Sequence, residues 1–289
     1  MKVCGFSFIR NARKYGYPVL ESIQSILPLC DHFVIAVGNS EDGTLEYIQS
    51  IPSDKIEIIE TVWDDRLREG GKVLAVETNK AFDAIAENYD WCFYIQGDEV
   101  VHEKYHAVIR QEMEHWLDNP KVEGLLFKYL HFWGTYDYIG TSRSWYRNEI
   151  RIIRNNKAIR SYRDAQGFRK NDKKLNVKPI DAYVYHYGWV KNPNTMMAKV
   201  KDFQKLWHDS NWIEKNIGNS DMFDFSEVDS LGLFQDTHPE VMKPLIENLN
   251  WHFQLNQIKK SLSLKKRVLA FVEKLTGARL FEYKNYKIV

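Results

Sequence analysis

Two adjacent carboxylates, Asp98 and Glu99, follow a strongly apolar segment, and this combination is the clearest indication of chemistry in the chain. Residues 91–95 read Trp-Cys-Phe-Tyr-Ile, which predicts a strand buried on both faces. The carboxylates would then lie at the carboxyl end of that strand, where open α/β sheets bind their ligands. Their oxygens suit a hard divalent metal ion. The alternative is that they cap the helix that follows.

Polar loops follow two earlier predicted strands, and the same sheet geometry would bring them to the carboxylates. Residues 9–12, Ile-Arg-Asn-Ala, end the first strand, and residues 38–44, Gly-Asn-Ser-Glu-Asp-Gly-Thr, follow the second. The second loop offers short polar side chains and two glycines that allow a ligand to approach the backbone. An ordinary strand-to-helix turn would have a similar composition. Together, the three loops predict a nucleotide-binding crevice with a metal at its rim.

Alternating strands and helices in the first 130 residues are expected to position these loops. Apolar runs predict strands, and segments with apolar residues on one face predict helices. The predicted strands cover 3–9, 33–37, 56–60, 122–130 and the segment that starts at 91, and the predicted helices cover 18–27, 44–51, 72–87 and 103–117. Repeated units of this length imply an α/β fold with a doubly wound, mostly parallel sheet flanked by helices.

The pattern changes after residue 130, although no linker or repeat interrupts the chain. Residues 131–140 are aromatic and rich in turn-forming residues. Two further strands and a helix are predicted at 147–154, 180–187 and 193–208. We predict an α/β domain over residues 1–210 and a mainly helical C-terminal extension, residues 211–289, that packs on it.

The tail, residues 259–275, combines basic and apolar residues in an amphipathic pattern. Its basic residues are Lys259, Lys260, Lys265, Lys266 and Arg267. The apolar residues expected to pack against the domain are Val268, Leu269, Phe271, Val272 and Leu275. Alternatively, this basic helix would make a peripheral contact with an anionic membrane surface.

Composition and charge exclude several classes of protein. The 289 residues are 44% hydrophobic, enough for a substantial core, and a net charge of +1 argues against a nucleic-acid binder. The 3 cysteines lack zinc-binding spacing and are expected to be reduced core thiols. No apolar run approaches the roughly 18 residues needed to span a bilayer, so we expect a soluble, cytoplasmic protein. The 9 tryptophans and 16 tyrosines favour carbohydrate binding, because sugars stack on aromatic rings.

The order and spacing of these motifs resemble glycosyltransferase family 2 and related enzymes with the GT-A fold. That family follows its second strand with an acidic loop ending in Asp-Gly-Thr, which Ser40-Glu-Asp-Gly-Thr44 matches. Glu77-Thr-Asn-Lys-Ala81 loosely matches its Asn-containing helix, and Gln96-Gly-Asp-Glu99 matches its Asp-x-Asp metal motif, with Gln96 in place of the first acid. The resemblance covers about residues 1–105 well and 106–200 more loosely.

The resemblance implies transfer of a hexosyl or N-acetylhexosaminyl group, with inversion, from a nucleoside-diphosphate sugar, with UDP the expected nucleotide. The acceptor would be a glycan or lipid-linked molecule in polysaccharide biosynthesis, reached in the cytoplasm or at the inner membrane surface. Mn²⁺ or Mg²⁺ would neutralise the departing diphosphate, with Asp98 and His186 as ligands. A carboxylate would take the acceptor proton; Asp164 is the first candidate, ahead of Asp137 and Glu149.

The resemblance also implies roles for polar and aromatic residues around the crevice. The residues expected to bind the donor are Phe8, Arg10, Asn39, Asp42, Lys72, Asn79, Gln96, Gly97 and Asp98. Trp133, Tyr136 and Trp145 are expected to form a stacking platform for the acceptor sugar. A structural role is the alternative for each of these residues.

Two other functions are compatible with such a sheet. A sugar nucleotidyltransferase would need a glycine-rich phosphate loop after its first strand, and residues 8–13, Phe-Ile-Arg-Asn-Ala-Arg, lack one. A non-catalytic nucleotide-sugar or glycan-binding module would explain Gln96, because the motif acid would have been lost together with the activity.

Overall fold

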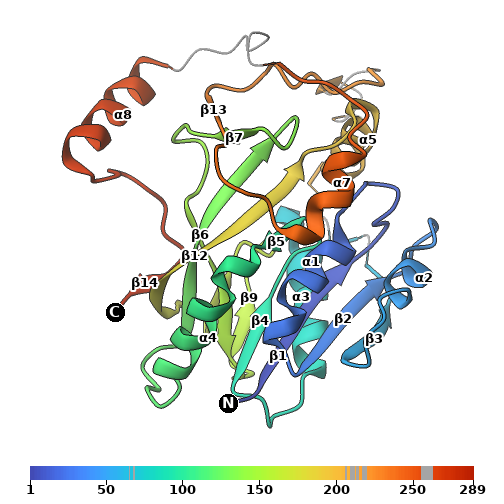
Figure 1. Ribbon diagram of the computed structural model, residues 1–289, viewed down its shortest axis with the longest axis vertical. Helices are drawn as coiled ribbons and strands as arrows, with labels where there is room; N and C mark the ends of the chain where they lie inside the picture. Colours follow the sequence, from blue (N-terminus) through green and yellow to red (C-terminus); the bar gives the residue numbers. More distant parts are fainter. Residues whose placement is uncertain are drawn as a thin grey trace.

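The computed structural model describes residues 1–289 apart from 65, 68, 206, 209–211, 213, 214, 217–219 and 255–262. The chain folds around one large mixed sheet (Figure 1). Its N-terminal strands are β1 (Val3–Ile9), β2 (His32–Gly38), β3 (Ile56–Thr61) and β4 (Trp91–Tyr94). Its later strands are β5 (Glu99–Val101), β6 (Gly124–Trp133), β7 (Tyr138–Gly140), β8 (Asn148–Arg154), β12 (Asn176–Trp189), β13 (Leu231–Leu233) and β14 (Lys287–Ile288).

The strand order confirms the predicted fold class. Over the described residues it is β13-β7-β6-β8-β4-β1-β2-β3, and β12 pairs with β6, β5 and β14. Strands β3, β2, β1 and β4 run parallel to one another, and β12 is parallel to β6. Strand β8 runs antiparallel between β4 and β6. The sheet is therefore a mostly parallel α/β sheet of the type expected from the resemblance to GT-A enzymes.

Helices cover both faces of this sheet, as a doubly wound fold requires. The helices are α1 (Val19–Ile26), α2 (Thr44–Gln49), α3 (Lys72–Ala84), α4 (His106–His115), α5 (Pro193–Gln204), α7 (Lys243–Glu247) and α8 (Leu264–Thr276). Ile23 of α1, Ile48 of α2 and Ile109 of α4 belong to one buried cluster, whereas Val73 and Phe82 of α3 belong to another. The two clusters are the two layers of the core.

Strand β4 shows why its segment is apolar throughout. Trp91 contacts the cluster under α1 and α4, Cys92 contacts the cluster under α3, and all residues of the strand are fully buried. After a short turn the chain forms β5, which pairs antiparallel with β12. The alternative that the carboxylates cap a helix is wrong, because the next helical turn, η3 (Glu103–Tyr105), begins later and is capped by His102. The three cysteines are buried free thiols, as expected.

The second half of the chain extends the sheet further than predicted. The segment predicted to be rich in turns, 131–140, begins as the end of β6 and finishes as β7. Strand β12 has 14 residues, and its start lies before the predicted strand 180–187. A second sheet comprises β9 (Ile159–Ser161), β10 (Phe168–Lys170) and β11 (Lys173–Lys174). Its buried Ile159 and Phe168 belong to the cluster that contains α3. Other short helical turns are η1 (Leu27–Leu29), η2 (Glu69–Gly71) and η4 (Glu240–Met242).

The expectation that the apolar residues of the tail pack against the domain is wrong for three of them. Val268, Phe271 and Leu275 are 53%, 63% and 69% exposed, while Leu269 and Val272 are half-buried. Helix α8 stands at the side of the molecule, at the upper left of the view (Figure 1). No helix in the described part of the chain is long and apolar enough to cross a membrane.

Polar contacts attach α8 to the domain instead. Lys266 pairs with Asp229 (2.8 Å), and Glu273 pairs with Arg143. The polar side of the helix therefore faces the domain, which is why the apolar side stays exposed. Lys259, Lys260 and the predicted boundary between residues 210 and 211 lie outside the described residues.

A buried ion pair joins β5 to β8. Two guanidinium nitrogens of Arg151 donate to the carboxylate of Glu99, at 2.7 and 2.5 Å, and both side chains are at most 2% exposed. Tyr129 of β6 also donates its hydroxyl to Glu99. The backbone amide of Gln96 donates to the same carboxylate at 3.2 Å. Glu99 therefore fixes the turn that carries Asp98.

Replacing Glu99 with alanine should strongly destabilise the fold. The change leaves the Arg151 guanidinium buried without its counter-charge, and breaking such a pair costs about 3–5 kcal/mol. Urea unfolding followed by circular dichroism would measure the free energy of unfolding. The double variant Glu99→Gln with Arg151→Met should recover part of the loss. A Glu99→Ala protein as stable as the wild type would contradict this role.

Candidate functional site

The loops after β1, β2 and β4 meet at one edge of the sheet. Ser7 of β1 donates a hydrogen bond to the Ile95 carbonyl oxygen at 2.6 Å, which joins β1 to the turn after β4. The Ala12 amide donates to the Thr44 hydroxyl at 2.8 Å, which joins the first loop to the second. The predicted convergence of the three loops is thus present.

The loop after β2 uses its polar side chains to hold the neighbouring backbone. Asp42 accepts hydrogen bonds from the amides of Lys14 (2.7 Å) and Thr44 (3.1 Å). Burial raises the pKa of Asp42, but hydrogen bonds from Thr44 and Lys14 outweigh it and bring the pKa below its ordinary value. Asn39, which is exposed, accepts from the Trp63 amide at 3.3 Å. Both donor-binding candidates therefore also support the loop.

Trp63, which sequence reasoning missed, adds an aromatic surface beside two predicted donor-binding residues. Its indole lies so close to Gly38 that an added Cβ there would be 2.3 Å from Nε1. The ring centroids of Phe8 and Trp63 are 5.8 Å apart, and the Arg10 guanidinium lies 5.6 Å from the centroid of Trp63. Such a cation beside aromatic rings suits a nucleobase and a phosphate.

Gln96 and Gly97 form the turn between β4 and Asp98. The Gln96 amide nitrogen Nε2 donates to the Tyr94 hydroxyl (3.2 Å) and to the Ala165 carbonyl oxygen (3.4 Å). An added Cβ on Gly97 would lie 2.8 Å from Ile9 Cδ1, so the turn needs glycine to pack on β1. Gln96 thus links the turn to the loop between β9 and β10.

The two candidates on α3 lie in different surroundings. Lys72 is exposed at the first position of the helix. Asn79 accepts the Ser161 amide at 2.9 Å and so holds β9 against α3. This contact of Asn79 is structural.

Asp98 is surrounded by cationic and basic side chains. Its Oδ2 lies 3.2 Å from Lys199 Nζ on α5 and 3.7 Å from His186 Nε2 on β12. Lys199 also donates to the Gly188 carbonyl oxygen at 3.0 Å. Burial raises the pKa of Asp98, but nearby positive charge, that of Lys199 above all, lowers it to about 2. Asp98 is therefore ionised at neutral pH.

The hydrogen bonds of His131 and His186 determine which ring nitrogen of His186 carries a proton. The nitrogen that faces Asp98 is left unprotonated. Burial lowers the pKa of His131 to about 3 and also lowers the pKa of His186, so both imidazoles are neutral. His131 Nε2 lies 2.9 Å from the Tyr146 carbonyl oxygen, which can only accept, so Nε2 carries the proton. His131 Nδ1 then accepts from His186 Nδ1, 3.3 Å away. His186 Nε2 keeps its lone pair.

The donor set around Gly188 fits a divalent metal ion. An added Cβ on Gly188 would lie 2.5 Å from His186 Nε2 and 2.7 Å from Asp98 Oδ2, so glycine keeps space open beside both groups. A carboxylate and an imidazole suit Mn²⁺. In the described residues no three His, Cys, Asp or Glu side chains gather as a complete metal site. Diphosphate oxygens and water would have to supply the remaining positions.

Asp164 lies on the loop that covers Gln96. Its two neighbours, Arg163 and Ala165, have φ values of 55° and 61°, a strained conformation that is often kept at functional sites. An added Cβ on Gly71 would lie 2.8 Å from Asp164 Cβ, so this loop packs on the start of α3. Burial raises the pKa of Asp164, and its Oδ1 is buried without a hydrogen-bond partner among the described residues.

The other two candidate bases differ sharply from each other. Asp137 is exposed in the turn between β6 and β7, and its side chain accepts from Thr135 Oγ1 at 3.0 Å. Glu149 of β8 is only 12% exposed in its side chain. Burial raises the pKa of Glu149 to about 8; Arg151 lowers it, and the charges of Glu99 and Asp164 raise it further.

The structure does not gather the three predicted acceptor-binding aromatics on one surface. The rings of Trp133 and Trp145 are edge-to-face, with centroids 5.6 Å apart. Trp133 is buried, and its indole donates to the Phe225 carbonyl oxygen at 2.9 Å. Tyr136 belongs to another cluster, where it contacts Tyr187. A shared stacking platform of all three is therefore excluded, although Trp145 lines a cavity.

No protein-family model and no curated protein matches the chain. Among solved structures, S. aureus TarS is 15% identical with a TM-score of 0.40, and the match covers 70% of this chain and 38% of TarS. The 4-diphosphocytidyl-2C-methyl-D-erythritol synthase of Anaerococcus prevotii is 7% identical with a TM-score of 0.33, covering 53% of this chain and 70% of that one.

Glucosyl-3-phosphoglycerate synthase from Mycobacterium tuberculosis, solved with Mn²⁺, UDP and phosphoglyceric acid, is 13% identical with a TM-score of 0.30. That match covers 45% of this chain and 43% of the synthase. The chain thus spans only about two fifths of TarS and of the mycobacterial synthase.

The buried Glu149 should make stability fall as pH rises. Between its ordinary pKa of 4.5 and about 8, the folded chain keeps a proton that the unfolded chain releases. The folded state therefore loses stability across this window, by about 1.4 kcal/mol for each pKa unit at most. Glu149→Gln removes the effect, so the variant should gain stability over the wild type at about pH 8 but not at about pH 5.

Urea unfolding at both pH values would measure these free energies. Glu60→Gln, at an exposed position of β3, is the matched control and should follow the wild type at each pH. If the stability difference between Glu149→Gln and wild type stays constant from about pH 5 to about pH 8, the buried carboxyl does not titrate as described.

Proposed function

We propose that this chain is an inverting, metal-assisted glycosyltransferase that uses a nucleoside-diphosphate sugar, with UDP as the expected nucleotide. One observation carries the proposal: an ionised Asp98 and the unprotonated Nε2 of His186 face each other beside Gly188, at the carboxyl end of β4. Polar loops from two neighbouring parallel strands meet at the same edge. Phosphate-bearing ligands bind at this edge of open α/β sheets.

The residues around the turn divide the work of holding the donor. Phe8, Arg10 and Trp63 would contact the base and the nearer phosphate, and Gln96 would bind a ribose hydroxyl through its amide. Asp98 and His186 would hold the divalent ion, which supplies charge neutralisation for the departing diphosphate. Lys199, beside Asp98, adds a further positive charge there. The transferred group would be a hexosyl or N-acetylhexosaminyl unit.

Asp164 is the proposed general base. A glycosyl acceptor hydroxyl needs a carboxylate within hydrogen-bond reach to take its proton. The buried, unpartnered Oδ1 of Asp164 and its raised pKa suit this task better than the exposed Asp137. Inversion follows if Asp164 activates the hydroxyl on the face of the sugar opposite the diphosphate.

The acceptor would be a glycan or a lipid-linked molecule used in polysaccharide biosynthesis, as in family 2 enzymes. We place the protein in the cytoplasm, in peripheral contact with the inner membrane surface through α8. The exposed Val268, Phe271 and Leu275 on that helix lie beside the exposed Lys265, a combination typical of interfacial helices.

Asp98→Asn should abolish donor hydrolysis and sugar transfer while leaving the fold intact. The amide keeps the shape of the carboxylate but removes the charge that holds the metal. Calorimetry with UDP in the presence of Mn²⁺ should show that binding weakens by about tenfold or more in the variant, as it should for wild type in EDTA. Asp54→Asn, at an exposed position before β3, is the matched control and should bind UDP normally.

Two outcomes would redirect this assignment. Full turnover by Asp98→Asn would remove Asp98 from the site, and UDP binding that ignores EDTA would remove the metal. Metal-dependent UDP binding without any donor hydrolysis would favour the second candidate, a non-catalytic nucleotide-sugar-binding module. The presence of Gln96 in place of a motif acid is the observation that keeps this candidate open.

A further inference from the structure

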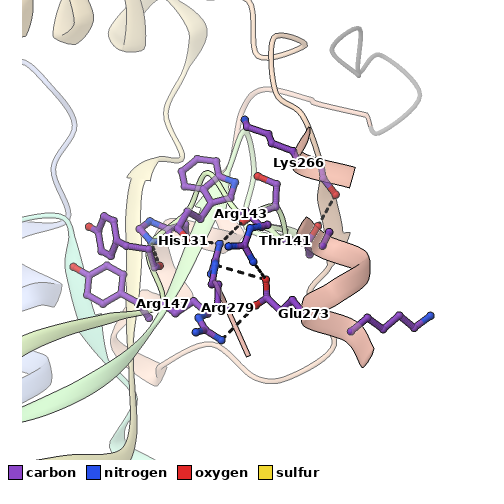
Figure 2. A pocket seen from close by; sticks show the side chains of 15 residues that line it. His131, Thr141, Arg143, Arg147, Lys266, Glu273 and Arg279 are labelled. Carbon is purple, nitrogen blue, oxygen red and sulfur yellow. Dashed lines mark hydrogen bonds and ion pairs between the residues drawn. The ribbon is translucent and has the colours of Figure 1, made fainter. Parts of the chain in front are cut away.

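A cavity of about 430 Å³ lies between α8 and the segment that links β7 to β8. Its size is within the range of small-molecule sites. Figure 2 shows Arg143, Arg147 and Arg279 directed toward Glu273 from the domain side and the chain after α8, while Lys266 lies farther along the helix. Of the predicted site residues, only Trp145 lines this cavity.

The cavity carries an excess of positive charge. Arg143 and Arg279 are only 12% and 7% exposed in their side chains. They share Glu273 and Glu282 with Arg147, so that three guanidiniums face two carboxylates. Backbone carbonyl oxygens satisfy further guanidinium N–H groups without supplying charge. Charge buried in this way is costly unless an anion completes it.

Two lysines of α8 extend the positive surface. Lys266 lines the cavity and pairs with Asp229 at 2.8 Å, and Lys274, the residue after Glu273, lines it too. The cavity is therefore lined by five cationic side chains, three arginines and two lysines, whose ion-pair partners are three carboxylates, Glu273, Glu282 and Asp229. Guanidiniums bind phosphate oxygens in pairs, and ammonium groups add to this as point charges.

Two histidines in contact connect the wall of the cavity to the candidate metal site. His131 lines the cavity, and its Nδ1 is 3.3 Å from Nδ1 of His186. On the other side of the His186 ring, Nε2 lies 3.7 Å from Asp98 Oδ2. Trp145, whose ring centroid is 5.0 Å from that of His131, gives the cavity an aromatic wall on which a sugar can stack.

From this arrangement we infer that the cavity binds a phosphate group of the acceptor, so that the enzyme glycosylates a phosphate-bearing glycan or lipid-linked phosphate. That the bound phosphate belongs to an acceptor rests on the proposed function; that the cavity binds a phosphate does not. Arg147, Arg279 and Lys274 hold the phosphate, and the rest of the acceptor extends past Trp145 and His131 toward Asp98.

Binding of inorganic phosphate and of glucose 6-phosphate, measured by calorimetry at constant ionic strength, tests this site, with glucose as the uncharged probe. Lys274→Gln should weaken binding of both phosphates by about threefold to tenfold. Arg279→Gln should weaken it further. Lys265→Gln, an exposed lysine of the same helix outside the cavity, is the matched control and should bind as wild type does. Because Arg279 is buried, the exposed Lys274 keeps the test valid if Arg279→Gln fails to fold.

The outcomes separate this inference from the donor proposal. Tighter binding of glucose 6-phosphate than of inorganic phosphate supports an acceptor site, and saturating UDP with Mn²⁺ should leave phosphate binding in place. If phosphate binds equally well to the wild type, Lys274→Gln and Lys265→Gln, the inference is wrong. Displacement of phosphate by UDP would also overturn it. If UDP fails to bind while Lys274→Gln still weakens phosphate binding, the donor proposal fails and the phosphate site stands.

Discussion

The buried pair of Glu99 and Arg151 is the interaction on which the site geometry depends. Strand β5 has only three residues, too few to hold its place by backbone pairing alone. Its pairing with β12 nevertheless sets Glu99 opposite His186. Arg151, anchored on the central strand β8, holds Glu99 with two hydrogen bonds, and Glu99 in turn holds the amide of Gln96. The turn between β4 and β5 is thereby closed at both ends.

Asp98 and Glu99 differ in role because Glu99 pairs with Arg151. Glu99 points into the sheet, where a guanidinium and a tyrosine hydroxyl consume its oxygens. Asp98 points toward α5 and β12, where its side chain keeps 13% exposure and meets Lys199 and His186. A buried carboxylate needs compensation from every side, whereas a partly exposed one can exchange a partner for a ligand. Only Asp98 is therefore suited to chemistry.

Local sequence patterns were enough to predict the N-terminal part of the sheet and the position of Asp98 at its edge. The four N-terminal strands follow from apolar runs, and the carboxyl-end rule then places their loops together. His186 was proposed from the resemblance to GT-A enzymes, and the structure places its Nε2 3.7 Å from Asp98. Arg151 was not proposed, since an arginine among isoleucines resembles a half-exposed strand, and its partner lies 52 residues away in sequence.

The remaining site residues depend on tertiary contacts that no local pattern encodes. Lys199 lies on a helix 101 residues from Asp98, and nothing in its own segment distinguishes it from other helical lysines. The amphipathic pattern of the tail predicted a helix correctly, but not which side faces the domain. Hydrophobic periodicity assigns an apolar face without saying what covers it. In α8 the ion pairs of Lys266 and Glu273 decide the orientation.

The order of hydrogen bonds along His131 and His186 couples the cavity wall to the candidate metal site. The Tyr146 carbonyl belongs to the segment that walls the cavity, and its position fixes the proton on His131 Nε2. That proton determines that His186 donates through Nδ1 and presents a bare Nε2 beside Asp98. Arg279 holds the same segment by donating to the Trp145 carbonyl oxygen at 3.1 Å. If the Tyr146 carbonyl oxygen moved away, His131 and His186 could exchange their protons between ring nitrogens, and His186 Nε2 would no longer be held without a proton. A fixed cavity wall is therefore needed for His186 to serve as a metal ligand.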